Sequence, residues 1–161
     1  MAKSKEEKTN VMRTLEQKKL PYTAHTYDPA GPIDGVSVAQ TLGQPPERVF
    51  KTLVTKGASG AYYVFDIPVA ENLDLKKAAK AVGEKSVAML PQKELLPLTG
   101  YVHGGCSPVG MKKQFPTVFH ETVLLYDTVC VSAGKIGFQV ELEPQALIRI
   151  TQGKTADVTV G

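Results

Sequence analysis

Hydrophobic residues recur at helical spacing in several short segments of the chain. In the first of them, Val11, Met12 and Leu15 share one helix face. Ser4 is followed three residues later by Glu7, an arrangement typical of a capping box at a helix start. Prolines and glycines mark the ends of these segments. The pattern predicts helices over about residues 4–19, ended by Pro21; 36–42, ended by Gly43; from Asn72 or Asp74 to 82, ended by Gly83; from Pro91; and from Pro144 to 150.

β-Branched and aromatic residues dominate other short segments. The run at residues 56–60 separates two of them and is typical of a hairpin turn. Because the strands are short and several follow tight turns, a mixed, partly antiparallel and curved sheet is favoured over a doubly wound parallel one. The fold class is therefore mixed α/β (α+β). The expected strands are Tyr22–Tyr27, Val49–Thr55, Ala61–Val69, Ser86–Leu90, Thr117–His120, Thr128–Ser132 and Phe138–Leu142.

The length and composition are those of one globular domain. The chain has 161 residues, of which 42% are hydrophobic and 22% charged, and no repeat or linker divides it. We therefore expect a single domain over residues 1–161. Residues 1–20 are too charged for a signal peptide, and no segment has the roughly 18 to 20 apolar residues of a membrane helix. These features predict a cytoplasmic protein without a membrane partner.

Charge and cysteine content narrow the function classes only slightly. A net charge of +3 permits an anionic partner such as RNA without demonstrating one. Cys106 and Cys130 are expected to be reduced thiols, and the cysteines and the three histidines lack the paired spacing of a zinc site. No Walker-type loop or dinucleotide fingerprint is present. We therefore expect neither a metal nor a cofactor.

The glycine-rich loop at residues 104–110 is the most informative segment for chemistry. It does not form a nucleophile elbow, because Pro108 follows Ser107 and has no amide hydrogen to give to an oxyanion. Cys106 would need a partner such as His103 to become a nucleophile. Adjacent glycines do let a backbone approach a ligand closely. The loop can therefore bind a carbonyl or ribose group without supplying a nucleophile.

Lys51 lies in an apolar strand. Strict alternation places it on the same face as Val49 and Leu53. A lysine there either extends along the surface, with its ammonium in water, or points into a pocket. The local pattern leaves both interpretations open.

Four segments, in this order and spacing, resemble the YbaK proteins, which are similar to the editing domain inserted in bacterial prolyl-tRNA synthetase. They are Phe50–Leu53, Leu73–Lys80, Gly100–Gly110 and Val131–Lys135, and the similarity runs from about residue 8 to about residue 158. The resemblance implies a mixed α/β fold with a curved, barrel-like and mostly antiparallel sheet surrounded by helices. It implies a free-standing enzyme that deacylates mischarged Cys-tRNA(Pro). Its partners would be the acceptor end of tRNA(Pro) carrying cysteine and prolyl-tRNA synthetase.

The resemblance also implies site residues. The implied catalytic residues are Lys51, Gly104, Ser107 and Pro108, and the implied substrate-binding residues are Tyr27, Gly105 and Gly110. Without it, Tyr27 would be a core-covering aromatic and Ser107 a turn hydroxyl. Two positions depart from the family pattern. Some members carry an acidic residue where this chain has Gln139, and an aliphatic residue is common where it has Cys106.

The mechanism that the family suggests needs no strong nucleophile from the protein. The thiol of the bound cysteine attacks its own ester carbonyl and releases the tRNA, while loop amides stabilise the oxyanion. Attack by water is the competing route. Two other function classes stay open: a deacylase of the same fold for Ala- or Ser-tRNA, and a tRNA- or synthetase-binding module without activity.

Overall fold

The computed structural model describes residues 8–161, in which the α-helices are short and begin at polar caps. The hydroxyl of Thr9 accepts a hydrogen bond from the amide of Met12 at the start of α1, and the Asp34 carboxylate caps α2 in the same way. Asp74 accepts from two amides at the start of α3. The helices are α1 (Asn10–Gln17), α2 (Gly35–Leu42), α3 (Leu75–Val82), α4 (Gln92–Thr99) and α5 (Pro144–Thr151).

These helices follow the sequence expectation except at their ends. In the described residues α1 begins at Asn10, because the Thr9 side chain supplies the cap there. The capping box expected at Ser4 and Glu7 lies outside the described residues. Pro91 precedes α4 as its N-cap and is not part of its first turn. Two short 3₁₀ helices, η1 (Pro46–Arg48) and η2 (Glu121–Leu125), were not predicted.

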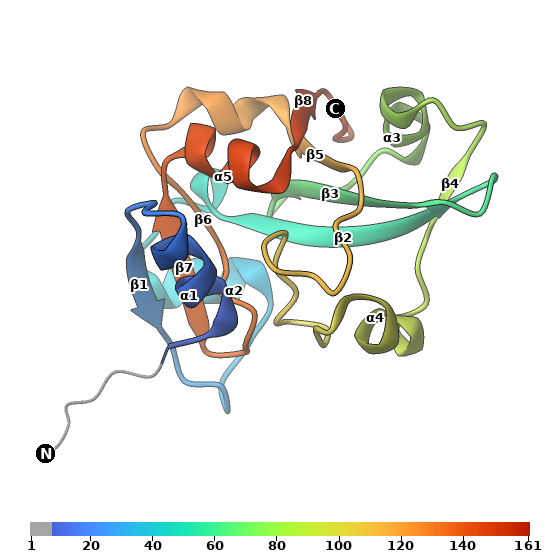
Figure 1. The fold of residues 1–161 in the computed structure, drawn as a ribbon. Coiled ribbons are helices and arrows are strands. Elements are labelled where there is room, and N and C mark those ends of the chain that lie inside the picture. The colour runs from blue at the N-terminus through green and yellow to red at the C-terminus, as the bar shows by residue number, and fades with distance from the viewer. Residues whose placement is uncertain (1–7) are drawn as a thin grey trace, which may run out of the picture.

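The strands form two sheets. One has the order β1-β7-β6 and the other the order β4-β2-β3-β5-β8. In Figure 1, β2 and β3 run through the middle of the molecule, with the smaller sheet on one side and α3 and β4 on the other. The strands are β1 (Thr23–Thr26), β2 (Phe50–Gly57), β3 (Tyr62–Pro68), β4 (Val87–Met89), β5 (Thr117–His120), β6 (Val129–Ser132), β7 (Phe138–Leu142) and β8 (Lys154–Ala156).

The expected barrel-like sheet was wrong, because the described strands form no closed sheet. In the described residues, one parallel β-bridge, between Val49 and Cys130, joins the two sheets where β2 and β6 pack together. β6 ends at Ser132, shortly after the bridge, and β4 pairs with β2 only from Thr55 onward. Among the described strands, residues 50–53 of β2 are therefore paired on the β3 side alone, and Val54 is the first to accept a hydrogen bond on the other side, from Leu90. Pairing is mostly antiparallel, as expected, but β3–β5 and β5–β8 are parallel.

The two faces of the β2–β3 hairpin pack against separate apolar clusters. Val54 and Val64 belong to the larger cluster, which also contains residues of α1, α5 and the loop before β5. Phe65 and Ile67 point to the opposite face, toward α3. This alternation follows from the two-residue period of a strand. It also determines to which face of the hairpin each polar side chain points.

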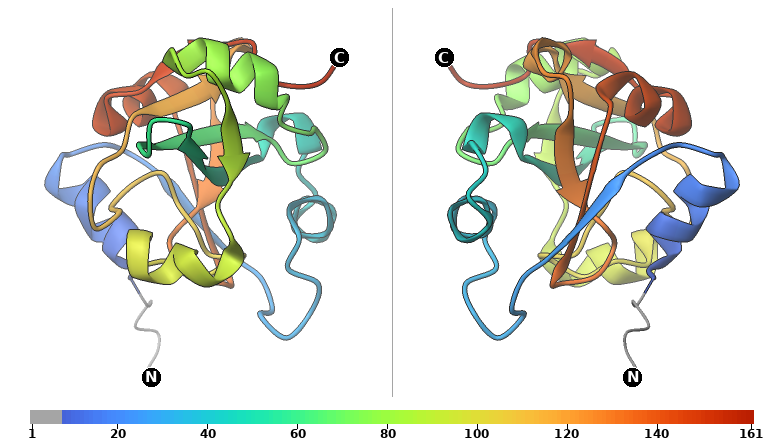
Figure 2. Two further views of the ribbon diagram at one scale, coloured as in Figure 1. Left: turned by 90° about the vertical axis from the view of Figure 1, so that its right-hand side faces the viewer. Right: turned by 90° about the vertical axis from the view of Figure 1, so that its left-hand side faces the viewer.

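α2 is separated from the other helices. Figure 2 shows α1 and α2 on opposite sides of the molecule, although Figure 1 projects them close together. Gly35, at the start of α2, lies against Val69, and a Cβ atom there would come within 2.3 Å of the valine side chain. This contact fixes the start of α2 beside the end of β3. Among residues 8–161, none of the helices is long and apolar enough to cross a membrane.

Candidate active site

A cavity of about 360 Å³ lies where the two sheets meet. The first half of β2 forms one wall, and the start of α2 with the preceding loop forms a second. The glycine-rich loop, β6 and β7 complete it. The lining residues are Tyr27, Ile33, Asp34, Gly35, Val36, Val38, Val49, Phe50, Lys51, Thr52, Leu53, Val69, Leu95, His103, Gly104, Cys106, Ser132, Phe138 and Gln139.

Lys51 lies on the wall of this cavity, between the apolar side chains of Val49 and Leu53. Its side chain is half-buried, and burial lowers the pKa of its ammonium, an effect that the carboxylate of Glu71 partly offsets. Of the two interpretations left open by strand alternation, the structure favours the pocket. A cation on an otherwise largely apolar wall can bind an anionic or polar group of a ligand.

Two more of the expected residues line the same cavity. Tyr27 follows β1, and its amide donates to the carbonyl of Gly137 at 3.0 Å. Gly104 has a φ of +89°, and a Cβ atom there would lie 2.9 Å from the end of the Ile33 side chain. The backbone conformation therefore favours glycine at this point, and a larger residue would also require the Ile33 side chain of the second wall to shift. The structure brings Tyr27, Lys51 and Gly104 together.

The other expected residues support the loop from outside the cavity lining. Ser107 is fully buried, and its hydroxyl accepts from the amide of Val109 at 3.2 Å, as a turn hydroxyl does. Pro108 is buried beside it. A Cβ atom on Gly105 would approach the Ile136 amide nitrogen to 3.2 Å, and one on Gly110 would approach the Tyr101 hydroxyl to 2.9 Å.

Several lining residues were not predicted. Ser132 belongs to one of the four family-like segments, but the resemblance implied no role for it. His103 was considered only as a partner for Cys106, and Phe138 carried no site signal. Cys106, where an aliphatic residue is common in the family, is buried, and its thiol pKa is raised to about 12 mainly by that burial. A neutral thiol agrees with packing and not with a nucleophile.

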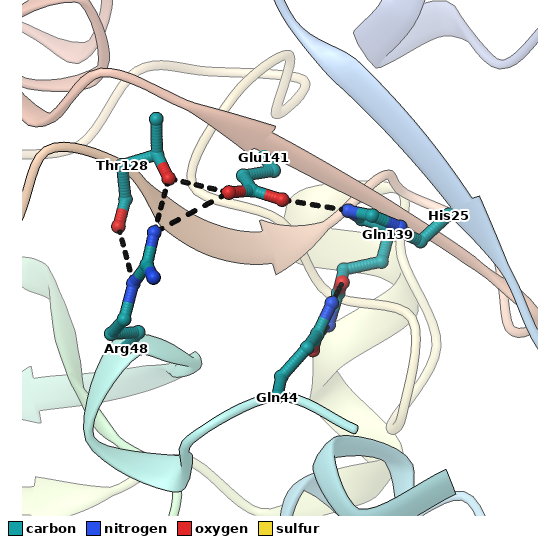
Figure 3. Close-up of polar contacts among 6 residues, drawn as sticks. All are labelled: His25, Gln44, Arg48, Thr128, Gln139 and Glu141. Carbon is teal, nitrogen blue, oxygen red and sulfur yellow. Dashed lines mark hydrogen bonds and ion pairs between the residues drawn. The ribbon is translucent and has the colours of Figure 1, made fainter. Parts of the chain in front are cut away.

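Gln139 is paired with one other amide. Its Oε1 accepts from Gln44 Nε2 at 2.7 Å, and its Nε2 donates to Gln44 Oε1 at 3.1 Å (Figure 3). Gln139 is only 3% exposed. The pair therefore keeps the position neutral and occupied where some YbaK proteins carry an acid.

A second polar cluster braces the strands behind Gln139 (Figure 3). Glu141 bonds to His25 at 2.8 Å, to the Thr128 hydroxyl at 2.5 Å and to Arg48 at 3.4 Å. His25, Glu141 and Cys130 are all of metal-binding type, and their ligand atoms lie within 4.8 Å of one another. Burial raises the pKa of the Cys130 thiol to about 12, and Arg48 already pairs with the carboxylate. The geometry therefore fits a hydrogen-bonded brace between β1, β7 and η1.

Comparison with known proteins gives consistent matches. The family profile of the aminoacyl-tRNA editing domain matches residues 34–150. A protein of Enterococcus faecalis described as a candidate Cys-tRNA(Pro)/Cys-tRNA(Cys) deacylase, EbsC, is 48% identical over 99% of this chain and 98% of its own length.

Solved structures agree with this match. The crystal structure of a candidate trans-editing enzyme for prolyl-tRNA synthetase is 28% identical, with a TM-score of 0.81 over 94% of this chain and 95% of its own. A hypothetical protein at 23% identity has the same fold, with a TM-score of 0.85 over 93% of this chain and 99% of its own. The family match covers most of the chain and includes Lys51 and Gly104 on the cavity wall. The resemblance to the YbaK proteins is thereby confirmed, and the chain belongs to the family of aminoacyl-tRNA editing domains.

Proposed function

We propose that this protein is a trans-editing deacylase that removes cysteine from mischarged Cys-tRNA(Pro). The observation that carries the proposal is the cavity with Lys51 on its wall, in a chain 48% identical to a candidate deacylase of that specificity. We assign the activity to the whole chain as one domain. Because its substrate is an aminoacyl-tRNA, we place the reaction in the cytoplasm.

The three expected residues at the cavity suit the end of an aminoacyl-tRNA. The ammonium of Lys51 binds the terminal ribose or phosphate by charge. The hydroxyl of Tyr27 offers a polar contact, and Gly104 lets the ligand approach the main chain. Gly105, Ser107, Pro108 and Gly110 act indirectly, by holding the loop in the shape that presents Gly104.

Attack by the thiol of the bound cysteine agrees with the chemistry of the cavity. Cys106 is neutral and Ser107 is turned into its own loop, so neither is suited to attack the ester. An aminoacyl ester is already reactive, and holding the thiol near the carbonyl supplies much of the acceleration. The oxyanion then requires donors from the main chain.

β2 provides main-chain groups that point away from β3. The Val49 carbonyl accepts from Val69 at 2.8 Å, so alternation directs the amide and carbonyl of Thr52 away from β3. Val54 lies two residues after Thr52, so its carbonyl points to the same side of β2. There it accepts a hydrogen bond from the Leu90 amide at 3.0 Å. Thr52 lines the cavity. We assign its amide, with the loop around Gly104, to the oxyanion site.

The alternatives differ in the substrate and in the partner. Water attack would suit Ser- or Ala-tRNA as well, because one small group changes binding in an apolar pocket by only about 1–3 kcal/mol. A binding module would keep the fold and lose turnover. The 28% identical structural neighbour is described as a candidate trans-editing enzyme for prolyl-tRNA synthetase, and this similarity favours that synthetase as a partner.

Single-turnover deacylation of Cys-, Ala- and Ser-tRNA(Pro) tests the proposal. We expect the wild type to hydrolyse Cys-tRNA(Pro) fastest. Lys51→Ala should slow it about 10- to 100-fold, since a charged hydrogen bond contributes about 1.5–3 kcal/mol. Lys56→Ala, at an exposed lysine on the same strand, is the matched control and should keep the wild-type rate.

The outcomes separate the function classes. Equally rapid loss of serine would count against thiol assistance and favour the water route. A folded protein that hydrolyses none of the three esters would leave the binding module as the better interpretation. Equal rates for both lysine variants would remove Lys51 from the site.

A further inference from the structure

A buried carboxyl group lies directly behind the cavity wall. Asp66 on β3 has no exposed surface and pairs with Thr52 across the hairpin. The Thr52 hydroxyl donates to Asp66 Oδ1 at 2.5 Å. Within residues 8–161, the second oxygen, Oδ2, is buried without any hydrogen-bond partner. Such an unsatisfied buried oxygen is costly and calls for an explanation.

The surroundings of Asp66 are almost entirely apolar. Phe119 of β5 pairs with it on one side, and Thr52 of β2 on the other. From the glycine-rich loop, the titratable group that faces it is the Cys106 thiol, whose pKa is raised by burial first and by Asp66 second. Burial raises the pKa of Asp66 to about 8, and the Thr52 bond only partly opposes this shift. The carboxyl therefore exchanges its proton near neutral pH.

Thr52 connects this carboxyl to the cavity. Thr52 and Cys106, which flank Asp66 on two sides, both line the cavity, and Asp66 itself does not. Any influence of Asp66 on a bound ligand must therefore pass through a neighbour. The hydroxyl of Thr52 is suited to this, because it can accept one proton while it donates another.

We propose that Thr52 and Asp66 form a relay that takes up the thiol proton of the substrate cysteine, with Thr52 in contact with the substrate and Asp66 as a positioning residue behind it. The proposal rests on the thiol-assisted deacylation described above. An unperturbed cysteine thiol has a pKa of about 8.5. The Asp66 carboxyl, with a pKa of about 8, is therefore well matched to accept its proton.

The step balances without any added reactant. The S–H bond of the substrate breaks while the bond from sulfur to the carbonyl carbon forms. The thiol proton passes to Thr52 Oγ1, and the proton already on Thr52 passes to Asp66 Oδ1. When the bond from the carbonyl carbon to the ribose oxygen breaks, the proton returns through Thr52 to that oxygen. The products are a thiolactone and uncharged tRNA, and Asp66 is again a carboxylate.

Four variants test the relay by single-turnover deacylation of Cys-tRNA(Pro) between pH 6 and 9. Asp66→Asn should lower the rate at pH 8 by about 100-fold, the lower range of general-base catalysis. Thr52→Val should do the same, and Thr52→Ser should restore most of the rate. Thr55→Val, whose hydroxyl on the same strand bonds to the Tyr63 carbonyl, is the matched control.

The pH dependence distinguishes a relay from a merely structural carboxyl. The ratio of the wild-type rate to the Asp66→Asn rate should hold steady up to about pH 8 and fall above it, because a base no longer helps once the substrate thiol ionises by itself at about pH 8.5. The wild-type relay acts on the neutral thiol, whereas Asp66→Asn depends on the free thiolate, so the advantage of the relay shrinks as the thiol ionises. A ratio that stays constant up to pH 9, or full activity in Thr52→Val, would overturn the relay.

Two further outcomes are informative. If Asp66→Asn fails to fold, the Thr52→Val and Thr52→Ser pair decides, since loss without rescue by serine would overturn the relay. A wild type that deacylates none of the Cys-, Ala- and Ser-tRNA(Pro) substrates would overturn the proposed function and the relay together. Activity with an unchanged pH profile in Asp66→Asn would overturn the relay alone.

Discussion

At the scale of single residues, the cavity combines one cation with a neutral amide. Lys51 lines one wall, and Gln139 lines another at the position where some YbaK proteins carry an acid. The reciprocal bonds with Gln44 use one donor and one acceptor of each amide. A carboxylate at position 139 could accept from Gln44 Nε2 but would place an oxygen against Gln44 Oε1.

We therefore predict that Gln139→Glu destabilises the protein at pH 7 by about 1–3 kcal/mol, because it leaves a buried acceptor unpaired. A protonated glutamic acid could donate to Gln44 Oε1 and restore both bonds. The folded-state pKa of the new carboxyl would be raised, so its stabilising bonds are present at low pH and lost as pH rises.

Urea unfolding of the wild type and Gln139→Glu at pH 5 and pH 7 measures this. The deficit should shrink strongly at pH 5. Gln40→Glu, at an exposed glutamine, should stay within about 0.5 kcal/mol of wild type at both values. A deficit of equal size at the two pH values would argue against the reciprocal amide pair.

Sequence reasoning reached some residues of the cavity and missed others for identifiable reasons. Lys51 lies in a motif that the family resemblance picked out. Asp66 was missed, although alternation placed it on the same face as Val64. Whether that face is buried depends on Phe119 and Cys106, which lie about 40 to 50 residues further along the chain. Local periodicity contains no information about such distant partners.

At the scale of elements, the glycine-rich loop has one backbone position that meets the opposite wall. Gly104 combines a φ of +89° with a close approach to Ile33. Gly60 in the hairpin turn has a similar φ of +95°, and nothing lies within 4 Å of a Cβ atom built there. The two positions thus share a left-handed backbone conformation and differ in their surroundings.

We predict that Gly104→Ala and Gly60→Ala each destabilise the fold by about 1–2 kcal/mol, the cost of a left-handed conformation for an L-residue. Only Gly104→Ala should also slow deacylation, because its methyl group would enter the cavity. Thermal unfolding and single-turnover kinetics on both variants provide the test. Equal kinetic effects would mean that Gly104 matters for its backbone alone.

Elements with local signals were predicted well, and those with distant partners were not. Asp74 and Gly83, which flank α3, are within the sequence pattern that predicted it. By contrast, β8 was missed, because its three residues become a strand only by pairing with β5. The open edge of β2 was missed for the same reason, since it depends on where β6 ends.

At the scale of the whole molecule, the protein contains two kinds of carboxyl group, and their contributions to stability change with pH in opposite directions. Hydrogen bonds and ion pairs lower the pKa of Glu141 and Asp157. Such groups stabilise the fold above their unfolded pKa, and that stability is lost as pH falls through the folded value. Burial instead raises the pKa of Asp66 to about 8, against about 3.9 when unfolded.

Between these two values folded Asp66 retains a proton that the unfolded chain has released. The contribution of Asp66 to stability therefore falls as pH rises from about 5 to 8, at up to about 1.4 kcal/mol per pH unit. Asp66→Asn cannot titrate, so its free energy of unfolding relative to wild type should increase steadily from pH 5 to pH 8.

Denaturant unfolding at pH 5, 6.5 and 8 measures that difference. Glu84→Gln, which removes a carboxylate whose pKa is lowered by hydrogen bonds from Ser59 and Tyr63, should keep a constant offset across the series. A constant offset for Asp66→Asn as well would mean that Asp66 is ionised throughout, and its burial would then require a cationic partner.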